Sequence, residues 1–506
     1  MAREPISHVD TAWLRMEDPT NLMVINGVLV FGAPLDFERL TETLETGLLR
    51  FRRFRQRVVM PKGVVGRLYW EDDPAFDMRN HLKRIELAPP ADRAVLEDLA
   101  GELSSTQLDF GRPLWQFHLV ESYGQGSALI CRLHHSMGDG VALVQVLLAM
   151  TSVDPEGLPL YVLQKEVPPP VRPRAPRIFP RTRRLIRGTC QAAGMICREG
   201  MKVIADPSRA VELARTGAGE VKAAAILVLR LPDPKTVLKG RLRVTKRVAW
   251  SQPLALADVK AIGRALGGTV NDVLLTAVAG SLRLYLQGRN EPVDGLNIRA
   301  IVPVNMRKPG IELQLGTELE LGNKFSLVFL SLPVDIADPA QRLCELRRRM
   351  DGLKGSYEAP AAWGILNAMG MSPKRIQEIA VDLFGTKGTA VMTNVMGPGV
   401  KLYLIGAPLE ELMFWVPQSG RLGLGVSILS YNNRVWLGVM SDQGLVCDPE
   451  AILAGFYSEY DALLDLAHKT PAKLSVKDML AMLDTALATL DSIAEDKNRV
   501  TRDSSQ

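Results

Sequence analysis

The sequence predicts an α/β protein in which two domains, each a mixed sheet flanked by helices, are joined by a crossover linker. Its 506 residues exceed the usual size of one compact domain. Short β-rich runs alternate with helical segments in both halves of the chain. A proline- and arginine-rich stretch separates the halves. We therefore expect an N-terminal domain over 1–163, a linker and helical crossover over 164–240, and a C-terminal domain over 241–506.

The first half begins with a predicted strand from Asn26 to Phe31 and a predicted helix from Asp36 to Leu49, whose apolar residues recur near helical spacing. Two further β-rich runs, Leu114 to Glu121 and Ser127 to His134, are separated by SYGQG and predict a hairpin. A helix is expected directly afterwards, from Val141 to Ser152. Side chains at the end of the second run can then project into a cleft.

The separating stretch, 164–188, contains six prolines, which exclude a helix interior and a central strand. Eight Lys and Arg residues and one Glu give it a net charge of +7 within a chain of +5, so the basic character is local. A solvated tether is one interpretation. Docking to anionic lipid headgroups is the other, because apolar residues interleave with the arginines. Nucleic acid is not an expected partner, since no recognition motif accompanies the charges.

The second half repeats the alternation after a helix-prone stretch over 190–230. Its predicted strands are Arg243 to Ser251, Ile298 to Pro303, Phe325 to Leu332, Ala390 to Asn394, Gly425 to Ser430 and Val435 to Met440. Its predicted helices are Leu254 to Leu266, a segment within GGTVNDVLLTAVAGSLRLYL, Ala340 to Leu353 and Pro449 to Leu466.

Composition narrows the class of protein. Hydrophobic residues make up 47% and charged residues 23%, as in an ordinary globular protein with a sizeable core. The N-terminus lacks the apolar region of a secretory signal, and no apolar run is long enough to span a bilayer. We therefore expect a cytoplasmic protein. The five cysteines show no zinc spacing, and no metal site is predicted.

The segment His134-His135-Ser136-Met137-Gly138-Asp139-Gly140 carries the chemistry, because it joins a predicted strand to a predicted helix. An imidazole can act as a general base near neutral pH. Neighbouring side chains on an extended chain point in opposite directions, so the two histidines are expected to differ in role. Asp139 is suited to holding the loop, and Gly138 and Gly140 to unusual backbone angles. The alternative is a polar strand end with two hydrogen-bonded histidines.

This HHxxxDG pattern resembles the signature of the CoA-dependent acyltransferase superfamily. Other segments are similar to motifs of its bacterial wax ester synthase/diacylglycerol acyltransferase family. These are Ile6 to Asp10, Pro113-Leu114-Trp115 (PLW), Gly268 to Val273 with Asn271-Asp272 (ND), Pro303 to Arg307, Gly322-Asn323, Thr393 to Pro398 and Ser430-Tyr431. The chain departs from the usual SNVPGP segment at Thr393 and Met396, and its linker is longer than expected. Either departure would affect acceptor preference or membrane contact.

The resemblance implies two chloramphenicol-acetyltransferase-like domains and a specific reaction. A long-chain acyl group would pass from acyl-CoA to diacylglycerol or to a long-chain fatty alcohol in a ternary complex. His135 would be the general base and His134 secondary, with Asp139 and Gly140 shaping the loop. Acyl-CoA would be a co-substrate, and no cofactor is expected.

Further roles are hypotheses that rest on motif type. Asn271 and Asp272 are candidates for stabilising the oxyanion or positioning substrate. Arg307 is a candidate partner for the Asp139 carboxylate, whose burial alone would be costly. The residues Pro113, Leu114 and Trp115 are expected to shape an acyl channel indirectly, and Trp115 itself to be a core aromatic.

Two other functions stay open. One is a condensation-type acyltransferase with another donor or acceptor, and the absence of an attached carrier domain argues against it. The other is an inactive protein that binds lipid surfaces. Because lipid acceptors are insoluble, we expect peripheral association with the inner membrane or lipid inclusions, through the basic linker and the apolar segment Pro360 to Met371.

Overall fold

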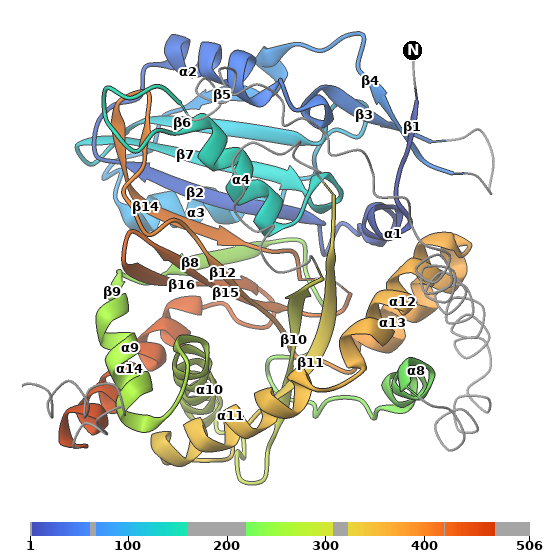
Figure 1. The fold of residues 1–506 in the computed structure, drawn as a ribbon, viewed down its shortest axis with the longest axis vertical. Helices are drawn as coiled ribbons and strands as arrows, with labels where there is room; N and C mark the ends of the chain where they lie inside the picture. Colours follow the sequence, from blue (N-terminus) through green and yellow to red (C-terminus); the bar gives the residue numbers. More distant parts are fainter. Residues whose placement is uncertain (1–2, 61–66, 160–218, 307–321, 419, 471–506) are drawn as a thin grey trace, which may run out of the picture.

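The computed structural model describes residues 3–60, 67–159, 219–306, 322–418 and 420–470. Each half of the molecule is organised around one large mixed sheet, and the helices lie outside these sheets (Figure 1). The predicted α/β class with mixed sheets is confirmed. The basic segment 164–188 and most of the 164–240 linker lie outside the described residues, so the predicted boundaries at 163 and 241 stay a prediction.

The N-terminal sheet has six strands. In spatial order they are β13 (Tyr403–Leu404), β14 (Ala407–Trp415), β2 (Val24–Phe31), β7 (Gly126–His134), β6 (Trp115–Tyr123) and β5 (Leu82–Ile85). The pairs from β13 to β6 are antiparallel, and β5 is parallel to β6. The predicted hairpin is therefore confirmed as β6 and β7. Two of the six strands come from residues beyond 400.

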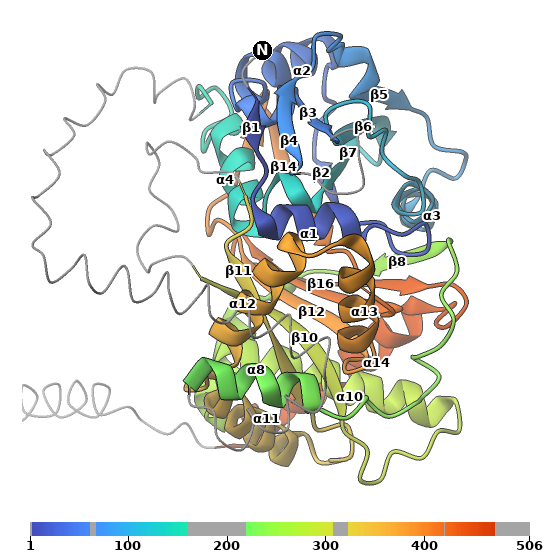
Figure 2. The ribbon, with the colours of Figure 1, turned by 90° about the vertical axis from the view of Figure 1, so that its right-hand side faces the viewer.

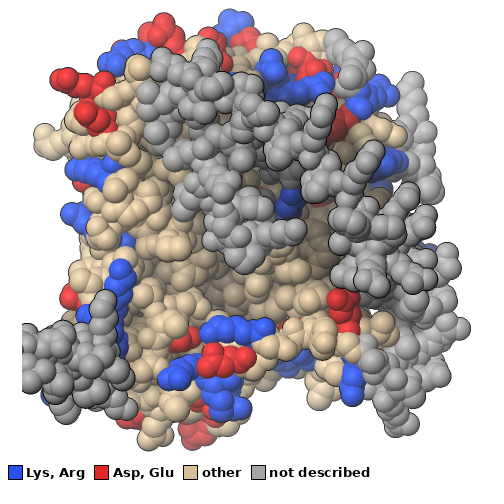
Figure 3. Space-filling view, in the orientation of Figure 1, with Lys and Arg blue, Asp and Glu red and all other residues tan. Residues whose placement is uncertain are grey.

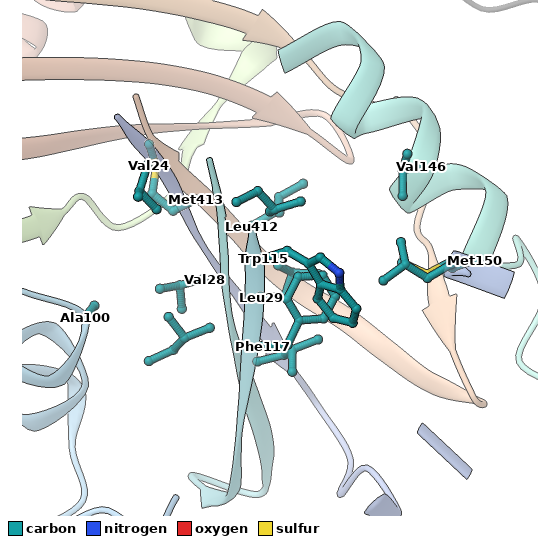
Figure 4. Close-up of a cluster of buried hydrophobic side chains, with 14 of the residues drawn as sticks. Val24, Val28, Leu29, Ala100, Trp115, Phe117, Val146, Met150, Leu412 and Met413 are labelled. Atoms are coloured by element: carbon teal, nitrogen blue, oxygen red, sulfur yellow. The ribbon is translucent and has the colours of Figure 1, made fainter. Parts of the chain in front are cut away.

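Helices cover both faces of this sheet, and the alternation of side chains along β2 explains how. Val28 lies on the side of helix α3 (Arg93–Ser104), where Ala100 packs, and Leu29 lies on the side of helix α4 (Gly140–Met150), with Val146 and Met150 (Figure 4). Successive residues of a strand point to opposite faces. Both faces of β2 are therefore apolar and buried.

The C-terminal sheet has seven strands. Along its main path they are β11 (Phe325–Leu332), β10 (Ile298–Asn305), β12 (Ala390–Met396), β15 (Leu424–Tyr431), β16 (Arg434–Asp442) and β8 (Lys246–Trp250), with β9 (Leu254–Ala255) also paired to β16. This sheet shares one apolar core with the helices α9 (Leu256–Leu266), α10 (Val270–Gly288), α11 (Pro339–Lys354) and α14 (Pro449–Lys469). All strands and helices predicted for residues 243–466 are present, with ends shifted by a few residues.

Helix α1 (His8–Met16) lies at the junction of the two halves (Figure 2). It contacts α12 (Glu358–Met371) and α13 (Lys374–Gly385) of the C-terminal half and the turn that follows β7 in the N-terminal half. Helix α8 (Gly219–Leu229) packs against α12 on the same side of the molecule. An N-terminal helix therefore connects both domains where the HHxxxDG segment begins.

The remaining described elements are short. They are α2 (Phe37–Thr43) with the π-helical turn Leu44–Leu48, the three-stranded sheet of β1 (Glu4–Pro5), β4 (Tyr69–Asp72) and β3 (Gln56–Val59), and the 3₁₀ turns Arg52–Arg55, Met78–Asn80 and His135–Met137.

The expectation that Pro360 to Met371 contacts a membrane needs correction. This segment is α12, and most of its side chains are buried against α1, α8 and β11. Met371, at its end, is 44% exposed. Within the described ranges, no single helix has the length and apolar character of a membrane span, although the bent pair of α9 and α10 meets both criteria together.

Candidate active site

The HHxxxDG segment runs from the last residue of β7 into α4. Asp139 is the N-cap of α4, where its Oδ1 accepts a hydrogen bond from the backbone N–H of Ala142 (3.0 Å). Its Oδ2 accepts another from the backbone N–H of Lys324 in the C-terminal half (3.0 Å). Asp139 therefore holds the loop and ties it to the other domain. Arg307, its hypothesised partner, lies outside the described residues.

The two glycines of the motif serve another purpose than expected. Gly138 has a φ of 174°, an extended value open to any residue, and Gly140 is the first residue of α4. A Cβ on Gly140 would meet Cγ2 of Val395 at 3.3 Å. The expectation of unusual backbone angles is wrong, and Gly140 instead permits close approach of α4 to β12.

His134 is completely buried and held on both sides of its ring. Its Nδ1 accepts a hydrogen bond from the backbone N–H of Ser136 (3.1 Å) and lies 2.8 Å from the Ser136 hydroxyl. Its Nε2 lies 2.9 Å from Oε2 of Glu17. The backbone N–H of His134 donates to the carbonyl of Leu114 in the PLW motif (2.9 Å). These contacts give His134 a structural place beneath the turn.

His135 occupies the boundary between the domains. Its ring stacks on Trp13 of α1 at 4.5 Å between centroids and 9° between planes, and Phe325 of β11 lies 5.3 Å away. Its Nδ1 is 3.0 Å from Oδ1 of Asn323. No described residue makes a hydrogen bond to its Nε2. Burial lowers the pKa of His135 to about 4, so the ring is neutral at pH 7.

Asn323 links this ring to a buried carboxylate. Its amide nitrogen donates to Oδ1 of Asp10 (2.6 Å) and to the backbone carbonyl of His135 (2.7 Å). Asp10 also accepts from the hydroxyl of Ser7, the N-cap of α1, at 2.7 Å. Burial raises the pKa of the Asp10 carboxyl, and the hydrogen bonds from Ser7 and Asn323 oppose that shift. The site thus joins residues near positions 10, 135 and 323.

Two apolar cavities lie on either side of this junction. The larger contains about 930 Å³ of empty space between α4 and the N-terminal sheet, and Leu133, Gly140 and Val144 are among its lining residues. The smaller, of about 600 Å³, is lined by Trp13 together with residues of α8, α12 and α13, such as Leu227 and Ile365. Figure 3 shows a largely uncharged hollow near the centre of one face.

The other predicted residues have structural partners. Asp272 forms a capping box with Thr269 at the start of α10 and is buried. Asn271 accepts a hydrogen bond at Oδ1 from the side chain of Asn394 (3.0 Å), a bond that does not use its own amide nitrogen. Trp115 is buried and donates to the carbonyl of Phe54 (2.9 Å). It packs on Phe54 and Phe117, which line the larger cavity, whereas Trp115 itself does not.

Sequence reasoning gave no role to the groups that surround the histidines: Asp10, Trp13, Glu17 and Asn323. Asp10 and Asn323 stood in segments that matched the family, which was a usable signal. No pattern in the sequence indicated a role for Trp13 or Glu17, because only the packing of α1 brings them to the turn after β7.

Models of a known protein family match most of this chain. Residues 6–274 match the model of the wax ester synthase/diacylglycerol acyltransferase catalytic domain, and residues 321–464 match the C-terminal domain of that family. A protein of Mycobacterium tuberculosis named "Probable diacyglycerol O-acyltransferase" is 27% identical over 461 residues, covering 89% of this chain and 93% of its own length.

Solved structures show the same fold. The wax ester synthase/diacylglycerol acyltransferase from Marinobacter aquaeolei VT8 superposes with a TM-score of 0.65 at 22% identity, covering 92% of this chain and 99% of that one. The first condensation domain of the calcium-dependent antibiotic synthetase gives 0.57 at 16% identity, covering 93% and 97%.

Proposed function

The chain belongs to the wax ester synthase/diacylglycerol acyltransferase family and is an acyltransferase, and we propose that it transfers a long-chain acyl group from acyl-CoA to a lipid hydroxyl with His135 as general base. The acceptor we propose is diacylglycerol or a long-chain fatty alcohol. The observation that carries this proposal is a buried, neutral imidazole that stacks on Trp13, which lines one apolar cavity, and whose motif contributes Gly140 to the lining of the other.

The chemistry of the ring suits a base. A neutral imidazole accepts a proton from the acceptor hydroxyl as its oxygen attacks the thioester carbonyl. The resulting tetrahedral oxyanion collapses, the carbon–sulfur bond breaks, and the imidazolium returns the proton to the CoA thiolate. No acyl-enzyme forms, so both substrates must be bound together. Asn271 remains our candidate donor to the oxyanion.

The cavities suit two hydrocarbon chains. The lining of each is almost entirely apolar, and burial of a methylene group in such a site contributes about 0.8 kcal/mol. We assign the acyl chain to the cavity under α4, which Gly140 of the motif lines, and the acceptor chain to the cavity beside Trp13. We propose that no cofactor takes part beyond acyl-CoA as co-substrate.

The test is product analysis with palmitoyl-CoA and either hexadecanol or dipalmitoylglycerol, comparing the wild type with His135→Ala. We expect ester formation to fall by about 10²–10⁴-fold in the variant, the range typical of losing a general base. His134→Ala tests the neighbouring position, where we expect a loss of stability as well as of activity. Undiminished ester formation in His135→Ala would refute the mechanism. An acyl-carrier thioester used in preference to acyl-CoA would favour a condensation-type enzyme.

Since both acceptors are poorly soluble, we also propose peripheral association with a lipid surface. Ile226 and Leu229 lie one helical turn apart on α8 and are 45% and 37% exposed, and Leu231 after the helix is 77% exposed. Ile379 on the neighbouring α13 is 52% exposed. The smaller cavity lies directly beneath these two helices. We propose that the acceptor enters the cavity from the lipid on this face.

A further inference from the structure

Two acceptors act on the His135 ring, its own backbone carbonyl and the side-chain oxygen of Asn323, and the hydrogen bonds of Asn323 can be counted. A side-chain amide has two N–H donors and one oxygen acceptor. The side-chain nitrogen of Asn323 lies 2.6 Å from Oδ1 of Asp10 and 2.7 Å from the backbone carbonyl oxygen of His135. The carbonyl oxygen can only accept a hydrogen bond, and the same is true of the Asp10 carboxyl when it is ionised. Both donors are therefore used. The Asn323 oxygen is the atom that faces Nδ1 of His135, at 3.0 Å.

That oxygen determines where the imidazole carries its proton. An oxygen acceptor at Nδ1 requires a proton on Nδ1, and in a neutral ring the other nitrogen, Nε2, then has the lone pair. We propose that Asn323 and Asp10 form a positioning pair that selects the Nδ1–H tautomer of His135 and so makes Nε2 the basic nitrogen. This rests on the proposed role of His135 as the base.

Asp10 is needed because an amide can be turned around. If the Asn323 side chain flipped, its nitrogen would face Nδ1 and favour the opposite tautomer. The Asp10 carboxylate opposes this flip, since it would then face an oxygen. Its own position is set at the start of α1, where Ser7 donates to Oδ2 (2.7 Å) and caps the backbone N–H of Asp10 (3.0 Å). On the same helix, Trp13 stacks on the ring and restricts its rotation.

The experiment measures the tautomer directly, on the full-length protein labelled with ¹⁵N-histidine. The signals of His135 are those missing in His135→Ala, and their chemical shifts identify the protonated nitrogen. We expect Nδ1–H in the wild type. In Asn323→Ala we expect a mixture of tautomers, because only the backbone carbonyl of His135 is left to favour Nδ1–H. Asp10→Asn should retain the tautomer better than Asp10→Ala, because its amide oxygen can still accept from Asn323.

Kinetics provide a second readout. Asn323→Ala should lower kcat by about 10–10²-fold with little change in KM, less than the roughly 10⁴-fold loss when a triad histidine is held in the wrong tautomer. The other groups that act on this ring are its own backbone carbonyl, Asp139, His134 and, through Asp10, Arg53, and all are unchanged in these variants.

Gln377→Ala is the matched control. Gln377 is also a buried amide bonded to α1, through the backbone carbonyl of Ala12 (2.7 Å), but it does not contact His135. We expect it to lower stability without changing the tautomer or the pH profile. The inference is overturned if Asn323→Ala keeps the wild-type tautomer and kcat. It is also overturned if adding Asn323→Ala to the His135→Ala variant lowers the residual activity by the same factor as adding it to the wild type. Asn323 would then act independently of His135. Full activity of His135→Ala would instead refute the proposed base and leave the tautomer result standing.

Discussion

At the scale of the residue, His135 illustrates how burial prepares a side chain for chemistry. Its ring is 6% exposed, stacked on Trp13, tilted against Phe325 and hydrogen-bonded to Asn323. Desolvation disfavours the charged imidazolium and lowers its pKa from 6.5 to about 4. A base that is unprotonated at neutral pH is available in nearly every molecule, at the cost of being a weaker proton acceptor.

The same shift predicts a dependence of stability on pH. Because the pKa is lower in the folded state, unfolding takes up a proton between pH 6.5 and about 4, and stability falls as the pH falls through this range. The shift corresponds to roughly 3 kcal/mol at the acid end. The free energy of unfolding in urea should therefore decline more steeply for the wild type than for His135→Gln. His118, whose pKa is also lowered to about 4 by burial, contributes equally to both proteins. Parallel declines would contradict this account.

At the scale of the element, α4 has two functions that follow from its position. Its N-terminus is capped by Asp139 of the motif, and its inner face lines the larger cavity with Leu143, Val144, Val146 and Leu147. A helix capped by the catalytic loop therefore also forms a wall of the proposed acyl site. Changes on its inner face should alter chain-length preference without altering the chemistry.

Val144→Phe tests this assignment. The larger ring would occupy cavity space, and each methylene excluded from an apolar site costs about 0.8 kcal/mol. Excluding two methylenes should lower kcat/KM for palmitoyl-CoA by about tenfold relative to octanoyl-CoA. Val141→Phe is the matched control, since Val141 is a half-buried valine of the same helix that does not line the cavity. A similar change in both variants would remove the acyl chain from this cavity.

At the scale of the whole molecule, the domains are joined by more than a linker. Strand β14, from residues beyond 400, pairs with Asn26 to Phe31 of β2 in the N-terminal sheet. Helix α1, from the start of the chain, packs on α12 and α13 of the C-terminal half. The site therefore forms only when the two halves are assembled. On this side of the molecule α8 and α13 present the apolar side chains that we assign to lipid contact.

Flotation with liposomes that contain anionic lipid tests this surface. The double variant Ile226→Glu, Leu229→Glu should bind less, because two buried contacts with lipid are replaced by charges that anionic lipid repels. The control is Leu284→Glu on α10, where the leucine is 39% exposed, similar to Leu229. We expect activity on a short-chain, soluble alcohol to be unchanged in both. Equal binding of the double variant and the control protein would contradict a role for α8.

The sequence by itself determined the features that depend on local patterns. The periodicity of apolar residues predicted most strands and helices, and the HHxxxDG segment located the loop after β7, because both signals lie within short windows. Strand β14 was missed since a bulge between Leu409 and Glu411 interrupts the alternation of buried and exposed residues. Only the tertiary structure brought Asp10, Trp13 and Asn323 to His135. Residues so far apart in the chain meet through the packing of α1 and of the C-terminal half, which no local pattern encodes.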